Sequence, residues 1–186
     1  MDLYTPDEFY IKDYRFVPYL TRDEIAERVT AMGQQLSTRF EDKTPIFVGI
    51  LNGAFMFMSD LIREVKVPLE IDFWKLSSYG DEKVSTGDVS EIKAIDANIA
   101  DRHLILVEDI VDTGLSMQYM RRQLQSHAPA SVTTITLLHK KEATRYEVKL
   151  DYVGFEIENR FVIGYGLDFA QQGRNLPHIY IRDENQ

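Results

Sequence analysis

Residues 107–116, VEDIVDTGLS, combine three carboxylates with a turn that contains a glycine. Glu108 and Asp109 are adjacent and follow a short apolar run, and Asp112 begins the turn. Backbone N–H groups at such a turn, together with the start of a helix, form a seat for an anion such as phosphate. Gly114 suits the turn because glycine adopts backbone conformations closed to other residues. Carboxylates repel phosphate, so the segment indicates a ligand with two different ends.

A sugar phosphate is such a ligand. Glu108 and Asp109 can accept hydrogen bonds from ribose hydroxyl groups, and their oxygens can also hold a divalent cation. The hydroxyls of Thr113 and Ser116 can join the backbone amides around the phosphate. Each feature alone has a plainer interpretation, since an acidic pair is commonly solvated and a glycine turn commonly only caps a helix.

The surrounding elements alternate between strands and helices. Buried strands are predicted at 45–50, 69–76, 103–107 and 131–139, shorter ones at 150–157 and 161–167, and a last edge strand at 178–183. Helices are predicted at 22–40, 56–65 and 116–127. This alternation predicts an α/β fold with a mostly parallel central sheet flanked by helices.

Ligands of such sheets bind beyond the carboxyl ends of the strands. That rule places 52–53, 108–116 and Lys140 on one rim, because each directly follows a predicted strand. The polar segment 77–95 is rich in Gly, Ser and Thr and is typical of a loop that closes over a site.

Composition narrows the possible partners. The chain has 186 residues, a net charge of −9 and no cysteine, which excludes disulfides and thiolate metal sites. Its acidity disfavours binding to nucleic acid, which depends on cationic contacts to phosphate. No apolar run is long enough to span a membrane, and the first residues do not resemble a secretory signal. We therefore expect a cytoplasmic protein without nucleic-acid or membrane partners.

Residues 104–117, LILVEDIVDTGLSM, resemble the phosphoribosyl pyrophosphate signature of the type I phosphoribosyltransferases. Other segments resemble, in the same order, those of hypoxanthine-guanine phosphoribosyltransferases: GILNGAFMFMSDLI, SSYG followed by STGDV, LLHKKE, DYVGFEIENRFVIGYGLDF and GRNLPHIYI. The resemblance runs from about residue 10 to residue 182.

The resemblance implies the type I phosphoribosyltransferase fold in a single domain, residues 1–186. Its core would span about 41–154, and a small hood would come from both chain ends, about 1–40 and 155–186. It also implies purine salvage with Mg²⁺. A purine attacks C1 of the ribose of phosphoribosyl pyrophosphate, pyrophosphate leaves, and the product is inosine or guanosine monophosphate.

Residue roles follow by position from the same resemblance. Glu108 and Asp109 would hold the ribose 2′ and 3′ hydroxyls, directly or through magnesium. The 5′-phosphate would bind the turn formed by Asp112, Thr113, Gly114, Leu115 and Ser116. Asp112 would also be the general base at N7 of the purine. Leu115 stands where some family members have a cationic residue, so this phosphate seat relies on amides and hydroxyls.

The purine would contact a second group of residues. Lys140 would donate to O6, Phe161 would stack on the ring, and Val162 would contact the base through its backbone. Asp168 would line the purine site and serve as a carboxylate of the magnesium site, and Arg174 would contact pyrophosphate.

Pyrophosphate would also bind Leu51, Asn52 and Gly53. The family has a non-proline cis peptide here, which turns a backbone amide toward pyrophosphate. Asn52 stands where the family often has lysine, so only the amide role carries over. Ser78 and Tyr79 would begin the flexible loop that excludes water from the reacting centre.

The donor at O6 selects between purines. Lys140 can bind a 6-oxo group, whereas the 6-amino group of adenine offers no acceptor, so we expect hypoxanthine and guanine as substrates. Two alternatives stay open: an enzyme of the same fold for xanthine, and a non-catalytic regulator that binds nucleotides. The resemblance also implies a homo-oligomer, a dimer or a tetramer.

Overall fold

The computed structural model describes residues 4–78 and 89–184. The helices are α1 (Arg22–Arg39), α2 (Phe55–Glu64) and α3 (Leu115–Gln125). The strands are β1 (Phe9–Ile11), β2 (Tyr14–Leu20), β3 (Ile46–Leu51), β4 (Glu70–Ser78), β5 (Val89–Lys93), β6 (His103–Val111), β7 (Ser131–His139), β8 (Tyr152–Glu156), β9 (Val162–Ile163) and β10 (Ile179–Arg182). They form a six-stranded and a four-stranded sheet.

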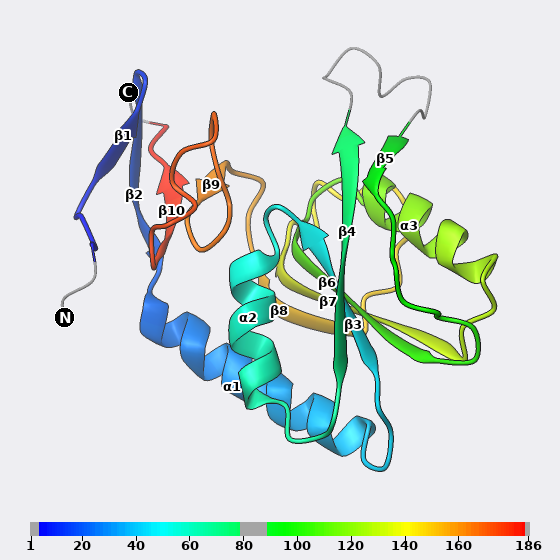
Figure 1. The fold of residues 1–186 in the computed structure, drawn as a ribbon. Coiled ribbons are helices and arrows are strands. Elements are labelled where there is room, and N and C mark those ends of the chain that lie inside the picture. The colour runs from blue at the N-terminus through cyan, green and yellow to red at the C-terminus, as the bar shows by residue number, and fades with distance from the viewer. Residues whose placement is uncertain (1–3, 79–88, 185–186) are drawn as a thin grey trace.

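The larger sheet has the strand order β5-β4-β3-β6-β7-β8. Strands β4, β3, β6, β7 and β8 pair in parallel, and β5 runs antiparallel to β4. Helices α1 and α2 cover one face of this sheet, and α3 covers the other (Figure 1). The predicted α/β fold with a mostly parallel sheet is therefore confirmed.

The central strands are apolar on both faces because helices cover both. In β3, Phe47 packs in the cluster on the α1–α2 side, while Ile46 and Val48 pack on the α3 side. Helix α1 begins at a capping box in which Thr21 and Glu24 satisfy each other's backbone N–H groups. The periodic apolar residues of α1 are buried beneath α2 and the sheet, as the helical spacing predicts.

The smaller sheet, which we call the hood sheet, has the order β1-β2-β10-β9 and joins both chain ends. It is antiparallel throughout, and β10 lies between β2 and β9. The prediction of 178–183 as an edge strand is therefore wrong. Its second neighbour comes from the N-terminal hairpin, a pairing that leaves no local signal in the sequence.

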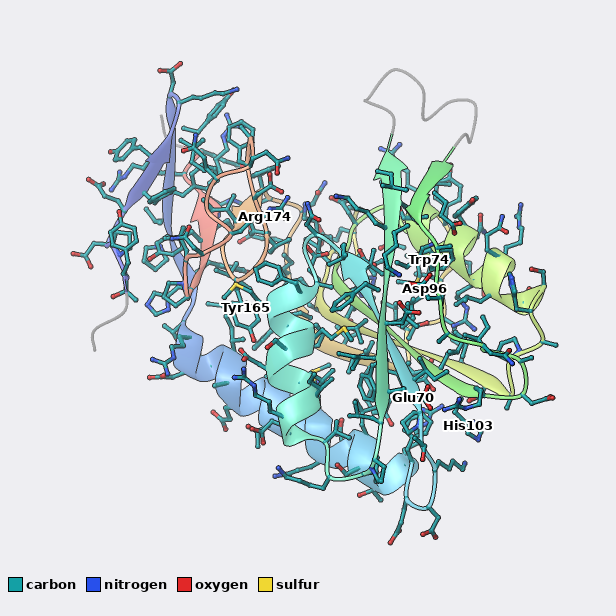
Figure 2. All side chains as sticks on the ribbon, viewed as in Figure 1. Glu70, Trp74, Asp96, His103, Tyr165 and Arg174 are labelled. Atoms are coloured by element: carbon teal, nitrogen blue, oxygen red, sulfur yellow. The ribbon has the colours of Figure 1, made fainter. Side chains whose placement is uncertain are left out.

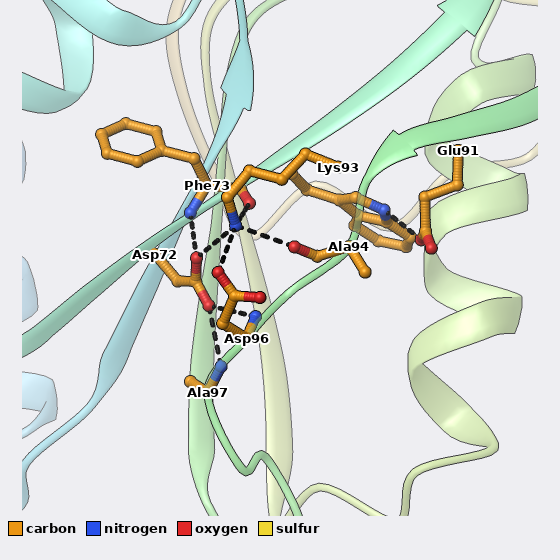
Figure 3. Close-up of polar contacts among 8 residues, drawn as sticks. Asp72, Phe73, Glu91, Lys93, Ala94, Asp96 and Ala97 are labelled. Atoms are coloured by element: carbon orange, nitrogen blue, oxygen red, sulfur yellow. Dashed lines mark hydrogen bonds and ion pairs between the residues drawn. The ribbon is translucent and has the colours of Figure 1, made fainter.

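Part of the expected loop at 77–95 is strand, because β5 extends the larger sheet along β4. Ser78 ends β4, whereas Tyr79 lies outside the described residues. Asp72 fixes the segment after β5 by accepting hydrogen bonds from the Asp96 and Ala97 amides at 2.7 and 2.9 Å (Figure 3). Lys93 Nζ donates to Asp72 at 3.0 Å.

Candidate functional site

Three neighbouring strands end on one rim of the parallel sheet. The end of β3 at Leu51 leads to Asn52 and Gly53, the end of β6 leads to Asp112, and the end of β7 leads to Lys140. Because β6 pairs in parallel with both β3 and β7, the residues after these strands lie at the same edge. The structure thus brings together the segments that the strand-end rule places on one rim.

Above this rim, a pocket of about 330 Å³ opens between the parallel sheet and the segment after β8. It is lined by Asn52, Gly53, Asp109, Ile110, Asp112, Lys140, Phe161, Val162, Leu167, Asp168 and Arg174. Nine of these residues are site predictions from the sequence. Ile110 and Leu167 are not, because an isolated apolar side chain gives no chemical signal that separates it from the core.

Strand β6 is longer than predicted and includes the acidic pair. Its pairing with β7 continues from Glu108 opposite Thr136 to Val111 opposite His139, so Glu108 and Asp109 lie within the strand and not beyond its end. Successive side chains of a strand point to opposite faces. Accordingly, Asp109 lines the large pocket, and Glu108 lines a smaller one beside the turn.

Burial is the main cause of the raised pKa values of Glu108 and Asp109. It raises the pKa of Asp109 to about 6, against the stabilising effects of the Ile110 amide and the Arg174 charge. Burial and the neighbouring Asp109 charge hold the pKa of Glu108 well above its usual value. Glu108 Oε2 is buried and accepts no hydrogen bond within the part of the chain that the structure describes. The pair therefore suits hydroxyl donors or a cation.

The set of donors also fits magnesium, provided that a substrate completes it. The described residues contain no group of three or more His, Cys, Asp or Glu side chains placed to hold a metal. Mg²⁺ is commonly bound by one or two carboxylates together with substrate phosphates and water. Glu108 and Asp109 could supply such carboxylates, whereas Asp168 is engaged by Arg174 at 2.6 Å.

Lys140 and Asp112 form an ion pair across the ends of β7 and β6. Lys140 Nζ lies 2.8 Å from Asp112 Oδ2, and the residue is only 7% exposed. The Asp112 side chain is 46% exposed. The pair thus offers a cationic donor and an anionic acceptor at adjacent points of the pocket.

The turn after Asp112 leads into α3 through Gly114. Gly114 has a φ of 86° and precedes α3, whose first N–H groups have no acceptors within the helix. Thr144 Oγ1 donates to the Asp112 carbonyl at 2.9 Å, and the Tyr146 amide donates to the Thr113 carbonyl at 3.1 Å. The small pocket, about 110 Å³, is lined by Glu108, Ile110, Val111, Asp112, Thr113, Gly114, Ser116 and Met117. The lining does not include the predicted Leu115.

The opposite wall of the large pocket comes mainly from two places: Phe161, directly before β9, and the loop between β9 and β10. Phe161 is 42% exposed, and Phe169 contacts it edge to face with ring centroids 5.4 Å apart. Arg174 also donates to the Gly166 carbonyl at 2.8 Å, which braces the loop that carries Asp168. Phe169 is not among the residues predicted from the sequence, and the structure places it against Phe161.

The Leu51–Asn52 peptide bond is cis, as the resemblance implied. Asn52 and Gly53 line the large pocket, and Leu51 ends β3. Gly53 lies so close to Asp109 that a Cβ atom there would be 1.6 Å from Asp109 Oδ2. Any larger residue at position 53 would therefore have to displace the Asp109 carboxylate.

Known proteins resemble this chain over most of its length. The Phosphoribosyl transferase domain family matches residues 19–170. The hypoxanthine-guanine phosphoribosyltransferase of Bacillus subtilis is 39% identical over 160 residues, 86% of this chain and 89% of that protein. The hypoxanthine phosphoribosyltransferase of Salmonella typhimurium is 41% identical over 158 residues, 84% and 89% of the two chains. A crystal structure of a Bacillus anthracis hypoxanthine-guanine phosphoribosyltransferase has a TM-score of 0.85 at 37% identity, covering 92% of this chain and 99% of that one.

Proposed function

The chain belongs to the phosphoribosyl transferase domain family, and we propose that it transfers the 5-phosphoribosyl group from phosphoribosyl pyrophosphate to hypoxanthine or guanine. It has the type I phosphoribosyltransferase fold expected from the resemblance. The observation that carries the proposal is the single pocket that joins Asp109, Asp112 and Lys140 of the rim to the residues of the opposite wall. The reaction yields the nucleoside monophosphate and pyrophosphate, a step of purine salvage.

The sugar phosphate would lie along β6 and the turn. Asp109, which is buried, and Glu108, which is half-buried, would accept hydrogen bonds from the ribose hydroxyls, and the amides of the turn from Asp112 to Ser116 would hold the 5′-phosphate. Asn52 and Gly53, on the same rim, would face the pyrophosphate, with Arg174 opposite them. Magnesium, held by Glu108 and Asp109 with Asp168 as a further carboxylate, would neutralise charge on the leaving group.

The purine would bind between Phe161 and the ion pair. Lys140 would donate to O6 while Asp112 accepts the proton from N7. As the bond from N9 to the ribose C1 forms, the bond from C1 to pyrophosphate breaks and its electron pair leaves with pyrophosphate. Proton transfer to Asp112 keeps positive charge from accumulating on the purine.

The choice of base depends on the buried donor of Lys140. A 6-oxo group accepts its hydrogen bond, whereas the amino group of adenine would leave the ammonium without an acceptor in the base. We expect adenine to be excluded. Xanthine also carries a 6-oxo group, so an enzyme for xanthine is the alternative of the same fold. The similarity to named enzymes disfavours a non-catalytic regulator.

A spectrophotometric assay with phosphoribosyl pyrophosphate, Mg²⁺ and each of four purines tests the proposal. Hypoxanthine and guanine should give nucleotides, and adenine should give none. Conversion of xanthine alone would favour the alternative, and no conversion of any purine would refute the enzymatic function.

We also propose a homo-oligomer, a dimer or a tetramer, in the cytoplasm, without nucleic-acid or membrane partners. None of the described helices is long and apolar enough to cross a bilayer. We retain the single domain 1–186, with a core at about 41–154 and a hood from about 1–40 and 155–186. The hood sheet, which joins both chain ends, supports the hood, whereas α1 packs on the parallel sheet and so lies with the core.

A further inference from the structure

Tyr165 lies outside the lining of both pockets described above, in the loop that carries Asp168. It is the middle of three consecutive residues with positive φ, between Gly164 at 97° and Gly166 at 101°, with its own φ at 49°. Glycine adopts this region freely, whereas a bulky side chain there is uncommon. The contacts of the tyrosine side chain therefore have to offset an unfavourable backbone conformation.

Those contacts lead away from the hood sheet into the main core. Tyr165 is 5% exposed and packs in the cluster that contains Ile25 of α1 and Phe57 of α2. Its hydroxyl donates to Asp60 Oδ2 on α2 at 2.6 Å. Figure 2 shows Tyr165 between the hood sheet and α2. Burial, with the hydrogen bond to Asp60, raises the pKa of Tyr165, so the hydroxyl keeps its proton and remains a donor.

The residue after Tyr165 contacts the rim directly. A Cβ atom on Gly166 would lie 2.2 Å from the Gly53 carbonyl oxygen, so the two backbones are in close contact. Helix α2 begins at Phe55, two residues after Gly53, and carries Asp60. The loop thus contacts the segment 53–60 at two points, its backbone at Gly53 and the Tyr165 hydroxyl at Asp60.

We propose that Tyr165 and Asp60 are positioning residues for the reaction. Their hydrogen bond fixes the loop that carries Asp168 and Arg174 against the helix that follows the pyrophosphate segment. This sets the spacing between the purine end and the pyrophosphate end of the substrates, which the reaction needs because attack and departure occur at one carbon. Neither residue lines the pockets in which the substrates would bind. The proposal rests on the proposed function.

Tyr165→Phe tests it by removing one oxygen atom. We expect the variant to fold, and kcat/KM for phosphoribosyl pyrophosphate to fall about 10-fold or more, as expected for a lost hydrogen bond to a charged acceptor. Tyr180→Phe is the matched control, because the Tyr180 hydroxyl is also buried but donates to the Pro6 carbonyl at 2.8 Å, within the N-terminal part of the hood. The Tyr180→Phe variant should have a lower melting temperature than the parent, but its kcat and KM should stay within about 2-fold of those of the parent.

Asp60 variants separate positioning from simple destabilisation. Asp60→Asn retains an oxygen acceptor and should stay within about 3-fold of the parent, whereas Asp60→Ala should match Tyr165→Phe. The double variant Asp60→Ala with Tyr165→Phe should be no slower than Asp60→Ala alone, because both changes remove one interaction.

The outcomes distinguish this proposal from the proposed function. An inactive parent chain would overturn the proposed function, and the positioning role with it. An active parent whose Tyr165→Phe and Tyr180→Phe variants have the same kinetics would overturn the positioning role alone. If Tyr165→Phe does not fold, equal activity of Asp60→Asn and Asp60→Ala would likewise overturn the positioning role.

Discussion

Asp112 and Lys140 pair at 2.8 Å, so each holds the other beside the pocket where the base would bind. Asp112→Asn preserves the size of the side chain but removes the proton acceptor. We expect kcat to fall about 100-fold or more while the affinity for phosphoribosyl pyrophosphate changes little. Single-turnover rates give the chemical step, and calorimetric titration gives the affinity. An unchanged single-turnover rate would exclude Asp112 as the base.

The raised pKa of Asp109 makes the stability of the protein depend on pH. The folded-state pKa of about 6 exceeds the ordinary 3.8, so the folded protein binds more protons than the unfolded chain between these values. The contribution of Asp109 to the free energy of unfolding is therefore fully present below about pH 4, and it is lost as the pH rises through about 6. The neutral Asp109→Asn variant avoids this loss and should gain up to about 3 kcal/mol relative to the parent across that window.

Urea unfolding of both proteins between pH 4 and 7.5, with a metal chelator, measures this difference. Asp13→Asn is the control, since it removes the same charge from an exposed position. Its difference from the parent should vary far less with pH. A pH-independent difference for Asp109→Asn would show that burial does not raise the Asp109 pKa.

The sequence predicts the polar residues of the site better than its apolar ones. Asp109, Asp112 and Lys140 lie within or directly after apolar strands, where a charged side chain needs an explanation. Phe169 and Tyr165 give no such signal, because an aromatic residue in a loop is as readily explained by packing. Their partners, Phe161 and a helix about 100 residues away, are known only from the fold.

At the scale of elements, local patterns predict what local forces determine. The apolar runs of β3, β6 and β7 and the capping box of α1 are confirmed because burial and capping depend on neighbouring residues. The pairing of β5 with β4 was missed, because Asp72 and Lys93 stabilise it through side chains in a polar segment. The end of β6 was placed too early, since Glu108 and Asp109 interrupt its apolar run before Ile110 and Val111 complete the strand.

At the scale of the whole molecule, the two sheets differ in how much core supports them. Besides residues shared with the main core, the hood sheet has a small cluster of its own: Ile11, Phe16, Ile163, Leu176 and Tyr180. The hood sheet also depends on pairing between the two chain ends, since Phe16 of β2 lies opposite Arg182 of β10. We expect the hood sheet to open by itself, at a lower free energy than global unfolding.

Hydrogen exchange of backbone amides measures this opening. Amides of β2 and β10 should exchange at least 10-fold faster than those of β3, whose residues are buried on both faces. Inosine monophosphate with pyrophosphate and Mg²⁺ should slow exchange in the hood sheet, because these ligands would bridge it to the rim and must leave before it opens. Equal rates for β2, β10 and β3 without ligand would show instead that the hood sheet and the parallel sheet unfold as one cooperative unit, and that closure over the substrates requires no separate opening of the hood.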